Sequence, residues 1–507
     1  MKDIVVQVVA ALGTAALSCM VNAQSAPQAA ATAGPAQTLP DAVKKAIHSH
    51  PEVQARFHDF TSSLEDKNIA GAGWRPRVDA QAWVGHEWRS NVPASPSFDW
   101  NRPGWGLTLT QLLYDGGLTS NLTRNYGFTK LSKFYDLRAT SESLANEVAI
   151  AYLDVQRYRQ TRALAENNYG VHKTTLDQIR QRQQSGVGRG VDLEQANARL
   201  ALAQVNLMTE SGNLNDVSQR YRRLVGEYPA ATLDPVPATD VVKLPAGTTQ
   251  DFEQALRENT TVLSKQALVQ AAEAVQEMAK ANYAPKLQLV ASTGRDRTMA
   301  AASDPRGNIQ SSSIQLLLTY NLYRGGADDA RSRQTAAQRY AAQDVRDYTC
   351  RNVQQNLSIA WDNIMRLRQQ LPFLREHVLA TSKVHTAYIQ QFQIGQRTLL
   401  DLLDTQNELF QARIAQVNAE SDLKKYEYQW MVNASQILQA LGLAQPYADQ
   451  QPDEYNELVL PDEVLKSCEG VVPDISNLTP MAQVPATTAT QVPATTATAS
   501  TAETGKH

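Results

Sequence analysis

Residues 114–117 read Tyr-Asp-Gly-Gly, and residues 323–326 read Tyr-Arg-Gly-Gly. The two motifs are 209 residues apart (323 − 114), and the same offset separates Gly186 from Gly395 (395 − 186). A constant offset between several landmarks indicates two copies of one structural unit, with matching elements of matching length. The two motifs therefore predict a tandem internal repeat.

The repeat divides the chain into two structural units and a linker. We predict a first repeat over residues 39–226, a linker over 227–250 and a second repeat over 251–442. A protein of 507 residues with 42% hydrophobic content can bury substantial cores. The chain is therefore expected to be largely folded.

Each repeat is predicted to contain a helix, two strands, a long helix and a further helix. The first helix of each repeat ends before an aromatic-x-Pro motif, Trp74-Arg75-Pro76 or Tyr283-Ala284-Pro285, because proline interrupts helical hydrogen bonding. Glycine pairs then end the strands. The expected ranges are 39–71 and 252–282 for the first helices, about 77–115 and 286–324 for the strands, 118–184 and 327–393 for the long helices, and 190–226 and 398–442 for the last helices.

The spacing of apolar residues distinguishes the strands from the helices. Ile314, Leu316 and Leu318 alternate with polar residues, which is typical of a strand with one apolar face. In the long helices, apolar residues recur every three or four positions, as in a coiled coil. The helix expected over 118–184 has 67 residues (184 − 118 + 1) and a length of roughly 100 Å. No globular core is that deep.

Four strands are too few to close a barrel. Bacterial outer-membrane barrels begin at about eight strands, and an open sheet edge is not tolerated in lipid. Three chains would supply twelve strands. The expected fold class is therefore mixed α and β: a trimeric 12-stranded outer-membrane β-barrel, with four strands per chain, continued by a long α-helical coiled-coil periplasmic tunnel.

Aromatic residues near the strand ends suit the interfacial girdles of such a barrel. The core of a soluble sheet would contain similar aromatics, so both interpretations stay open for these residues. They are Trp83, Trp88, Trp105, Tyr114, Tyr320 and Tyr323, with Trp100 close by.

The two ends of the chain differ from the repeats in composition. Residues 1–23 combine Lys2, an apolar run and the small residues of Val21-Asn22-Ala23, which predicts a cleaved signal peptide. A lipoprotein anchor at Cys19 is the less favoured alternative. Residues 24–38 are expected to be a flexible segment. Residues 443–507 are rich in Pro, Thr and Ala, which predicts a disordered C-terminal tail.

Composition and motifs exclude several classes of function. The net charge of −3 provides no basic field for nucleic acid. The three cysteines, Cys19, Cys350 and Cys468, are far apart and lack metal-ligand spacing, so no metal or other cofactor is expected. Whether Cys350 and Cys468 pair is left open. No zinc-protease motif, phosphate-binding loop or nucleophile elbow occurs, so no enzymatic activity is expected.

Together these features resemble the TolC family of outer-membrane factors. The resemblance covers about 39–443 and rests on the repeat, on Asn321-Leu322-Tyr323-Arg324-Gly325-Gly326, and on residues 394–404, Ile-Gly-Gln-Arg-Thr-Leu-Leu-Asp-Leu-Leu-Asp. It implies a homotrimeric channel in the outer membrane of a Gram-negative bacterium, in contact with outer-membrane lipid and with its helical part in the periplasm. The implied protein partners are a periplasmic membrane-fusion (adaptor) protein and an inner-membrane ABC exporter or RND pump.

Two kinds of cargo fit such a channel. The sequence of residues 394–404 most resembles the branch that serves type I secretion of large adhesins or repeat toxins. The alternative is the outer-membrane component of a multidrug efflux pump. A soluble periplasmic coiled-coil adaptor is an alternative of another class, but it would not explain the paired amphipathic strands.

An acidic stripe follows the second helical turn. Asp401, Asp404 and Glu408 stand at i, i+3 and i+7 and therefore share one helical face. Spacing alone favours a solvated helix face. The resemblance instead implies that Asp401 and Asp404 line the periplasmic entrance, where threefold symmetry would make each carboxylate a ring that selects cations.

The turns between the helices are predicted to form the tip of the tunnel and its gate. Gly186 and Gly395 are expected where the chain reverses, because glycine accepts a positive φ. The resemblance implies a gate link between Arg397 and Asp192, held by a charge-assisted bond that breaks on opening. Phe392 replaces a hydrogen-bonding tyrosine of the family, and Val191 a threonine, so Phe392 is expected only to pack.

Overall fold

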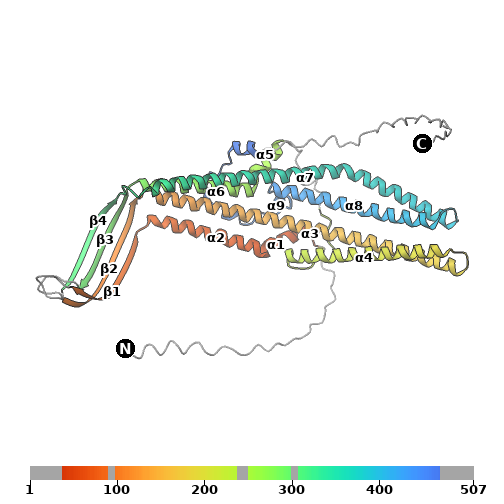
Figure 1. Cartoon of the computed structure of the whole chain (residues 1–507), viewed down its shortest axis with the longest axis horizontal. Coiled ribbons are helices and arrows are strands. Elements are labelled where there is room, and N and C mark those ends of the chain that lie inside the picture. The colour runs from red at the N-terminus through yellow and green to blue at the C-terminus, as the bar shows by residue number, and fades with distance from the viewer. Residues whose placement is uncertain (1–36, 90–97, 237–248, 298–306, 469–507) are drawn as a thin grey trace, which may run out of the picture.

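The computed structural model describes residues 37–89, 98–236, 249–297 and 307–468. The predicted signal peptide, all but the last two residues of the predicted N-terminal segment, and residues 469–507 lie outside these ranges. The described chain is elongated, with a sheet at one end and paired helices reaching the other (Figure 1). No helix in the described ranges is both long enough and apolar enough to cross a membrane.

The two predicted repeats have the same order of elements. The first repeat contains α1 (Leu39–Ser49), α2 (Pro51–Gly71), β1 (Arg77–Arg89), β2 (Phe98–Tyr114), α3 (Leu118–Gln184) and α4 (Gly190–Val225). The second contains α5 (Thr249–Glu258), α6 (Thr260–Lys280), β3 (Lys286–Arg297), β4 (Asn308–Thr319), α7 (Ala327–Gln393) and α8 (Leu399–Asn433). The long helices α3 and α7 each have 67 residues.

Both repeats contribute to one antiparallel sheet with strand order β1-β2-β3-β4. In its register, Val78 lies opposite Leu109, and Leu109 lies opposite Ala291. β1 and β4 form the two edges. The strand expected to run to residue 324 ends at Thr319, opposite Lys286. Pairing stops there because Pro285, which precedes β3 and would lie opposite Tyr320, has no N–H to donate.

The long helix α3 packs against most of the other helices of the described chain (Figure 1). It packs against α2 and α6 near the sheet and against α4 and α8 toward the opposite end. Gly117 and Gly326, with φ of +88° and +82°, precede α3 and α7 and turn the chain from strand into helix. The four helices α3, α4, α7 and α8 therefore form two long hairpins.

The opening helix of each repeat is two helices, which corrects the prediction of single helices over 39–71 and 252–282. His50 is extended because it precedes Pro51, and the residue before a proline avoids the helical conformation. In the second repeat Asn259 is extended, and its side chain caps α6 by accepting the N–H of Val262 at 2.9 Å. The breaks therefore have different local causes at equivalent places.

The helix predicted over 398–442 also ends early. α8 stops at Asn433, Ser435 has a φ of +56°, and α9 covers Ile437–Ala440. The buried carboxylate of Glu142 accepts the N–H groups of Ile437 and Leu438, at 3.0 and 3.3 Å. Burial raises the pKa of Glu142, although these hydrogen bonds act to lower it. This contact with α3 stabilises the break, which the local sequence pattern did not predict.

The prediction that the whole C-terminal tail is disordered is wrong for residues 443–468. This segment forms η4 (Ala448–Gln450), η5 (Asp453–Glu457) and α10 (Asp462–Cys468). It buries Leu460, Val464 and Leu465 in the main core, and a disulfide joins Cys468 to Cys350 of α7. The compositional bias toward Pro, Thr and Ala lies mainly beyond residue 468, so it does not describe this part of the tail.

A buried ion-pair cluster also holds the segment. The carboxylate of Glu454 lies 2.6 Å from the ammonium of Lys67 and 2.8 Å from that of Lys130. Burial acts to raise the pKa of Glu454, but the hydrogen bonds from Lys130 and Lys67 hold it below its ordinary value. A side chain at Gly127 would meet the Glu454 carboxylate at 2.5 Å, so it would force this carboxylate to shift from its position beside the two lysines.

Candidate functional site at the helical tip

The two tip turns have matching geometry. Gly186 and Gly395 have φ values of +80° and +77°, as expected for the residues that reverse the chain. The N–H of Gly186 donates to the carbonyl of Gln183 at 2.9 Å, and that of Gly395 donates to the carbonyl of Phe392 at 3.1 Å. Both turns lie together at the end of the molecule opposite the sheet (Figure 1).

Asp401 has a local role at the start of α8. Its carboxylate accepts the backbone N–H of Thr398 at 3.3 Å, and its own N–H donates to the Thr398 hydroxyl oxygen at 3.2 Å, which completes a capping box. The Thr-x-x-Asp spacing contains this signal, but the sequence interpretation above did not use it. Asp401 therefore fixes the first turn of the helix that holds the other two acids.

Asp404 bridges the two helical hairpins. Its carboxylate lies 2.5 Å from the guanidinium of Arg199, which is on α4. Sequence reasoning missed Arg199, because nothing in the spacing along the chain connects positions 205 residues apart. Glu408 is exposed on α8 and lies one turn further from the tip than Asp404.

Arg397 has partners from its own hairpin within the described chain. Its Nε donates to Gln391 at 2.9 Å, its guanidinium lies 4.4 Å from the ring centre of Tyr388, and Asp401 is 4.0 Å away. Asp192 lies in the first turn of α4 and is half-buried. A single chain therefore does not bring Arg397 onto Asp192.

Phe392 packs between the two hairpins, as expected for a residue without a hydroxyl. Its ring contacts an apolar cluster that includes Leu176 of α3 and Leu403 of α8. The guanidinium of Arg182 also lies 5.0 Å from the ring centre. This cation–π contact adds to the apolar packing at the tip.

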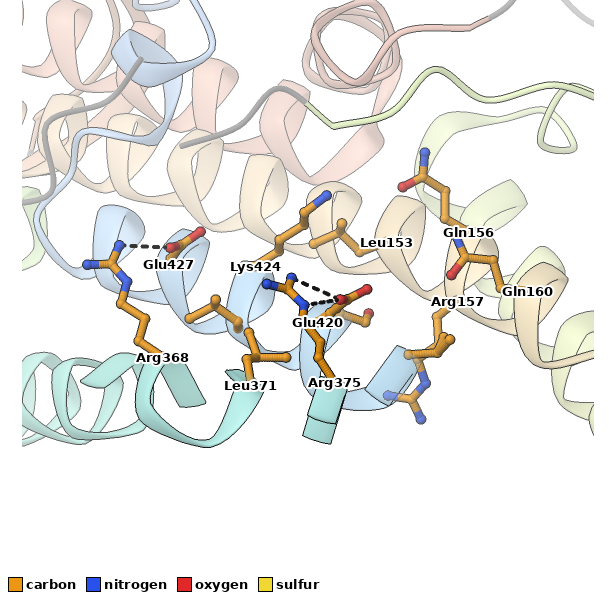
Figure 2. A pocket seen from close by; sticks show the side chains of 13 residues that line it. Leu153, Gln156, Arg157, Gln160, Arg368, Leu371, Arg375, Glu420, Lys424 and Glu427 are labelled. Carbon is orange, nitrogen blue, oxygen red and sulfur yellow. Dashed lines mark hydrogen bonds and ion pairs between the residues drawn. The ribbon is translucent and has the colours of Figure 1, made fainter. Parts of the chain in front are cut away.

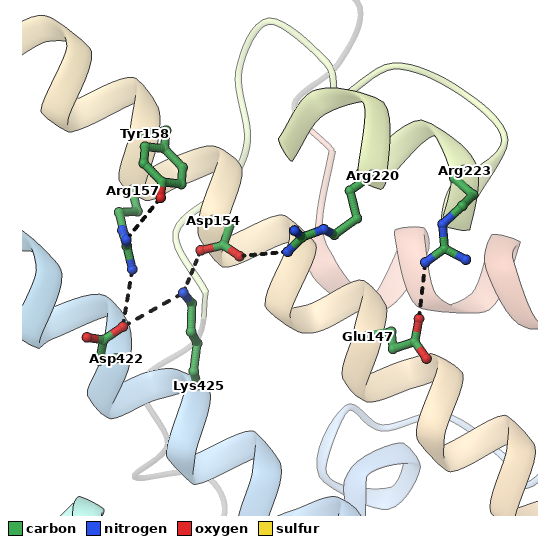
Figure 3. Close-up of polar contacts among 8 residues, drawn as sticks. All are labelled: Glu147, Asp154, Arg157, Tyr158, Arg220, Arg223, Asp422 and Lys425. Atoms are coloured by element: carbon green, nitrogen blue, oxygen red, sulfur yellow. Dashed lines mark hydrogen bonds and ion pairs between the residues drawn. The ribbon is translucent and has the colours of Figure 1, made fainter. Parts of the chain in front are cut away.

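A network of ion pairs joins α3 to α4 and α8 farther from the tip (Figure 3). The buried carboxylate of Asp154 lies 2.5 Å from the ammonium of Lys425 on α8 and 3.7 Å from the guanidinium of Arg220 on α4. Arg157 of α3 contacts Asp422 at 3.2 Å. The network holds three helices in fixed relative positions, and no local motif predicted it.

Comparison with known proteins gives the family of the chain. The model of the family described as "Outer membrane efflux protein" matches residues 42–227 and 252–431, one match in each predicted repeat. The chain belongs to this family.

Curated relatives agree with this assignment. The chain is 27% identical over 424 residues to "Outer membrane efflux protein BepC" of Brucella suis, which covers 83% of this chain and 90% of BepC. It is 22% identical over 422 residues to "Outer membrane protein TolC" of Escherichia coli strain K12, covering 80% and 82%. It is 23% identical over 411 residues to "Alkaline protease secretion protein AprF" of Pseudomonas aeruginosa, covering 78% and 82%.

Solved structures show the same fold. The outer-membrane channel CmeC of Campylobacter jejuni superposes with a TM-score of 0.73 at 14% identity, over 85% of this chain and 90% of CmeC. The resemblance to the TolC family is thus confirmed. The chain is an outer-membrane efflux channel of a Gram-negative bacterium, with its helical part in the periplasm, and it is a transport protein and not an enzyme.

The predicted barrel aromatics of this outer-membrane efflux protein occupy exposed positions. Trp88, near the end of β1 away from the helices, is 77% exposed, and Tyr323, past the helix-proximal end of β4, is 82% exposed. The ring of Trp83 covers Gly104 on β2, where an added side chain would meet the ring at 2.5 Å. Tyr114, Tyr320 and Trp105 are also exposed, whereas Trp100 is buried.

The wall of the efflux protein contains a cavity of 640 Å³ midway along the helices (Figure 2). Arg368 and Arg375 of α7 line it and contact Glu427 and Glu420 of α8, at 3.1 and 3.0 Å. Lys424 lies between the two glutamates along α8. These ion pairs join the two helices of one hairpin.

Proposed function

We propose that three copies of this chain form one channel, and the sheet edges carry this proposal. Each of β1 and β4 has one edge with a row of backbone groups that no other strand in the described ranges pairs with. Apolar residues on the sheet, such as Val84, Ile314 and Leu316, are 86%, 79% and 64% exposed. Lipid suits such a face but not an open edge, so the edges of neighbouring chains must pair. Three chains supply twelve strands, enough for a closed barrel.

The acids of the tip give this channel its ion preference. Asp401, Asp404 and Glu408 lie along one side of α8, and threefold symmetry would make a ring of each. Rings of carboxylates at a constriction attract cations and repel anions. The entrance is therefore the selective part of the pore.

The gate link is proposed to lie between chains. Arg397 extends from one hairpin and Asp192 from the other, and in a closed ring the second hairpin of one chain adjoins the first hairpin of the next. Charge reversal of either residue should raise the conductance of the closed channel, because the tip loosens. Wild-type conductance in Arg397→Glu and in Asp192→Lys would place the gate elsewhere.

The channel is proposed to be the exit duct of a tripartite machine for type I protein secretion. A periplasmic adaptor would hold it to an inner-membrane ABC exporter. Two observations support protein cargo: the wording of residues 394–404, and the relative AprF, which is described as an alkaline protease secretion protein. The relative BepC, described as an efflux protein, favours the second candidate, a drug efflux duct served by an RND pump.

A deletion strain separates the two cargoes. Loss of a large surface or secreted protein, with unchanged drug sensitivity, is the expected result. Restoration by the wild-type gene on a plasmid controls for effects on neighbouring genes. Drug hypersensitivity with normal protein secretion would contradict type I secretion and support the efflux pump.

A further inference from the structure

A shallow groove of 570 Å³ crosses β2, β3 and β4 on the apolar side of the sheet. Its walls include Leu107, Leu109 and Ile314. Ala291 also lines the groove and lies between Leu109 and Ile314 in the register of the strands. The side chain of Ala291 is shorter than both of these neighbours, so the surface is lowest there. The groove therefore has the shape and the apolar walls to hold an acyl chain.

This side of the sheet is the side that suits lipid. Side chains alternate between the two faces of a strand, and residues directly opposite one another share a face. Apolar residues form one row across the four strands, and polar residues form the next row on the other face: Val78, Leu109, Ala291 and Ile314, and then Asp79, Thr108, Ser292 and Ser313. Outer-membrane barrels turn apolar residues toward lipid and polar residues toward the lumen. The groove therefore opens toward the membrane.

Two arginines, Arg295 and Arg297, follow Thr293 of the groove on the same face of β3. β3 begins at Lys286 beside the helices, which are in the periplasm, so its other end points toward the outer leaflet (Figure 1). Leu287 and Arg295 are eight residues apart (295 − 287), about 26 Å along a strand and roughly 20 Å in height at the tilt of a barrel strand. The apolar band of a barrel is about 25 Å tall. The two arginines therefore lie at the level of the outer headgroups.

Neither arginine is paired with an acid of the described chain. Arg295 is exposed and Arg297 is half-buried, and no hydrogen bond or ion pair joins either guanidinium to a described residue. Asp99 is the one acid on this face of the four described strands, and it lies opposite Trp88, beyond the last pair between β2 and β3. A cation at the edge of hydrocarbon is stabilised by an anionic partner. β3 is an inner strand, so a neighbouring chain at β1 or β4 would leave these arginines uncovered.

We propose that the groove and the two arginines bind a phosphorylated lipid of the outer leaflet. In a Gram-negative outer membrane this lipid is lipid A, a glycolipid with phosphates and several acyl chains. One acyl chain lies in the groove, and the guanidinium groups donate to a phosphate, whose oxygens suit the planar fork of arginine. Trp105, opposite Arg295 in the register, is 44% exposed at the level where tryptophan favours the interface. The proposal rests on the barrel of the proposed function, which turns this face toward lipid.

Native mass spectrometry of the purified full-length protein in detergent tests the site. The probe is lipid A with both phosphates, added over a range of concentrations, and we expect saturable binding. Lipid A without its phosphates should bind about tenfold more weakly, because the charge-assisted hydrogen bonds are lost. Phosphatidylglycerol, which has a phosphate but a different body, should also bind more weakly. Inorganic phosphate should not compete at millimolar concentration, since it has no acyl chain for the groove.

Three variants make the test specific. Arg295→Gln combined with Arg297→Gln should weaken binding of lipid A about tenfold. Ala291→Phe should fill the groove and also weaken binding. Arg77→Gln makes the same chemical change on the other face of the sheet, at the end beside the helices, and should bind lipid A as wild type does.

Equal affinity of wild type and the double arginine variant, or of lipid A with and without its phosphates, would overturn the site. Unchanged affinity in Ala291→Phe would overturn the role of the groove, and phosphatidylglycerol binding as tightly as lipid A would overturn lipid A as the occupant. Ion conduction measured on the same preparations reports on the channel separately. A failed binding test with normal conduction would therefore leave the proposed function intact.

Discussion

At the scale of single residues, the acids of the tip differ in how they are held. Asp401 caps α8, Asp404 is paired with Arg199, and Glu408 is exposed. The charge of Asp404 is thus partly compensated by a cation on the neighbouring hairpin, whereas the charge of Glu408 faces solvent. This difference allows the contribution of each charge to ion selectivity to be separated.

We predict that the double substitution Asp401→Asn with Asp404→Asn lowers the preference of the pore for cations. Arg199→Gln should have the opposite effect, because it removes the cation that compensates Asp404. Reversal potentials in planar bilayers under a KCl gradient measure both changes. Glu420→Gln changes an acid of α8 that lines the cavity of Figure 2, and it serves as a control that should leave the reversal potential unchanged. Equal reversal potentials in wild type and in the double variant would show that these acids do not line the pore.

His172, which is buried, and His385, which is half-buried, make the stability of the tip depend on pH. Burial lowers the pKa of His172 and His385 in the folded protein below the usual value of about 6.5. As pH falls below about 6.5, the unfolded chain takes up protons more readily, so the folded state loses relative stability. The loss continues until pH reaches the lower folded pKa values.

We therefore predict that replacing both histidines, with His172→Gln and His385→Gln, flattens the decline in melting temperature between pH 7.5 and about pH 5. Thermal unfolding followed by circular dichroism at a series of pH values measures this decline. His58→Gln changes an exposed histidine of α2 and should leave the decline as in wild type. An unchanged slope in the double variant would assign the pH dependence to other groups.

At the scale of elements, helix packing depends on ion pairs between helices as well as on apolar contacts. Asp154 is nearly buried and contacts cations from two neighbouring helices, α8 and α4 (Figure 3). Glu147 lies two turns away on the same helix and contacts Arg223 at 3.4 Å, with both side chains about half-exposed. Asp154 and Glu147 therefore provide a buried and an exposed ion pair on the same helix, whose contributions to stability can be compared.

We predict that Asp154→Asn destabilises the folded protein by about 2 kcal/mol, because it removes the nearer of two carboxylates beside the largely buried ammonium of Lys425 and leaves only Asp422, at 3.8 Å. Glu147→Gln should cost at most about 1 kcal/mol, since an exposed ion pair contributes little. Denaturant unfolding of both variants, compared with wild type, gives the two values. A cost for Asp154→Asn as small as that for Glu147→Gln would mean that Lys425 reaches solvent or another partner.

Whether an element has a local or a long-range cause explains whether it could be predicted from the sequence. The long helices and the strands follow from periodic apolar spacing and from the glycine pairs, which act locally, so their positions were predictable. The break at Ser435 and the folded segment 443–468 depend on contacts with distant residues such as Glu142. The Asp404–Arg199 pair, likewise, joins positions with no shared local signal. Unused local signals were the capping-box spacing of Asp401, the position of His50 before Pro51 and the capping side chain of Asn259.

At the scale of the whole molecule, the sheet of a single chain is incomplete, because its two edge strands need partner strands. β1 and β4 are edge strands of 13 and 12 residues, and long apolar edges promote aggregation unless another strand pairs with them. The helical hairpins have no corresponding deficiency, because each already packs against the other. Assembly of the trimer is therefore expected to depend most on the sheet.

We predict that β1 of one chain pairs with β4 of the next, and paired cysteines can locate the contact. A cysteine at Val84 of β1 is combined with single cysteines at successive positions of β4, from Ile309 to Leu318, in a chain lacking its three native cysteines. Disulfides require Cα atoms about 4.4–6.8 Å apart, so only positions in register should cross-link under oxidation. Non-reducing electrophoresis should then show covalent trimers for a few alternating positions, because alternate side chains share a face. Each cysteine alone is the control. Monomers at every position, from a protein that still inserts into the membrane, would show that the edges of β1 and β4 do not meet.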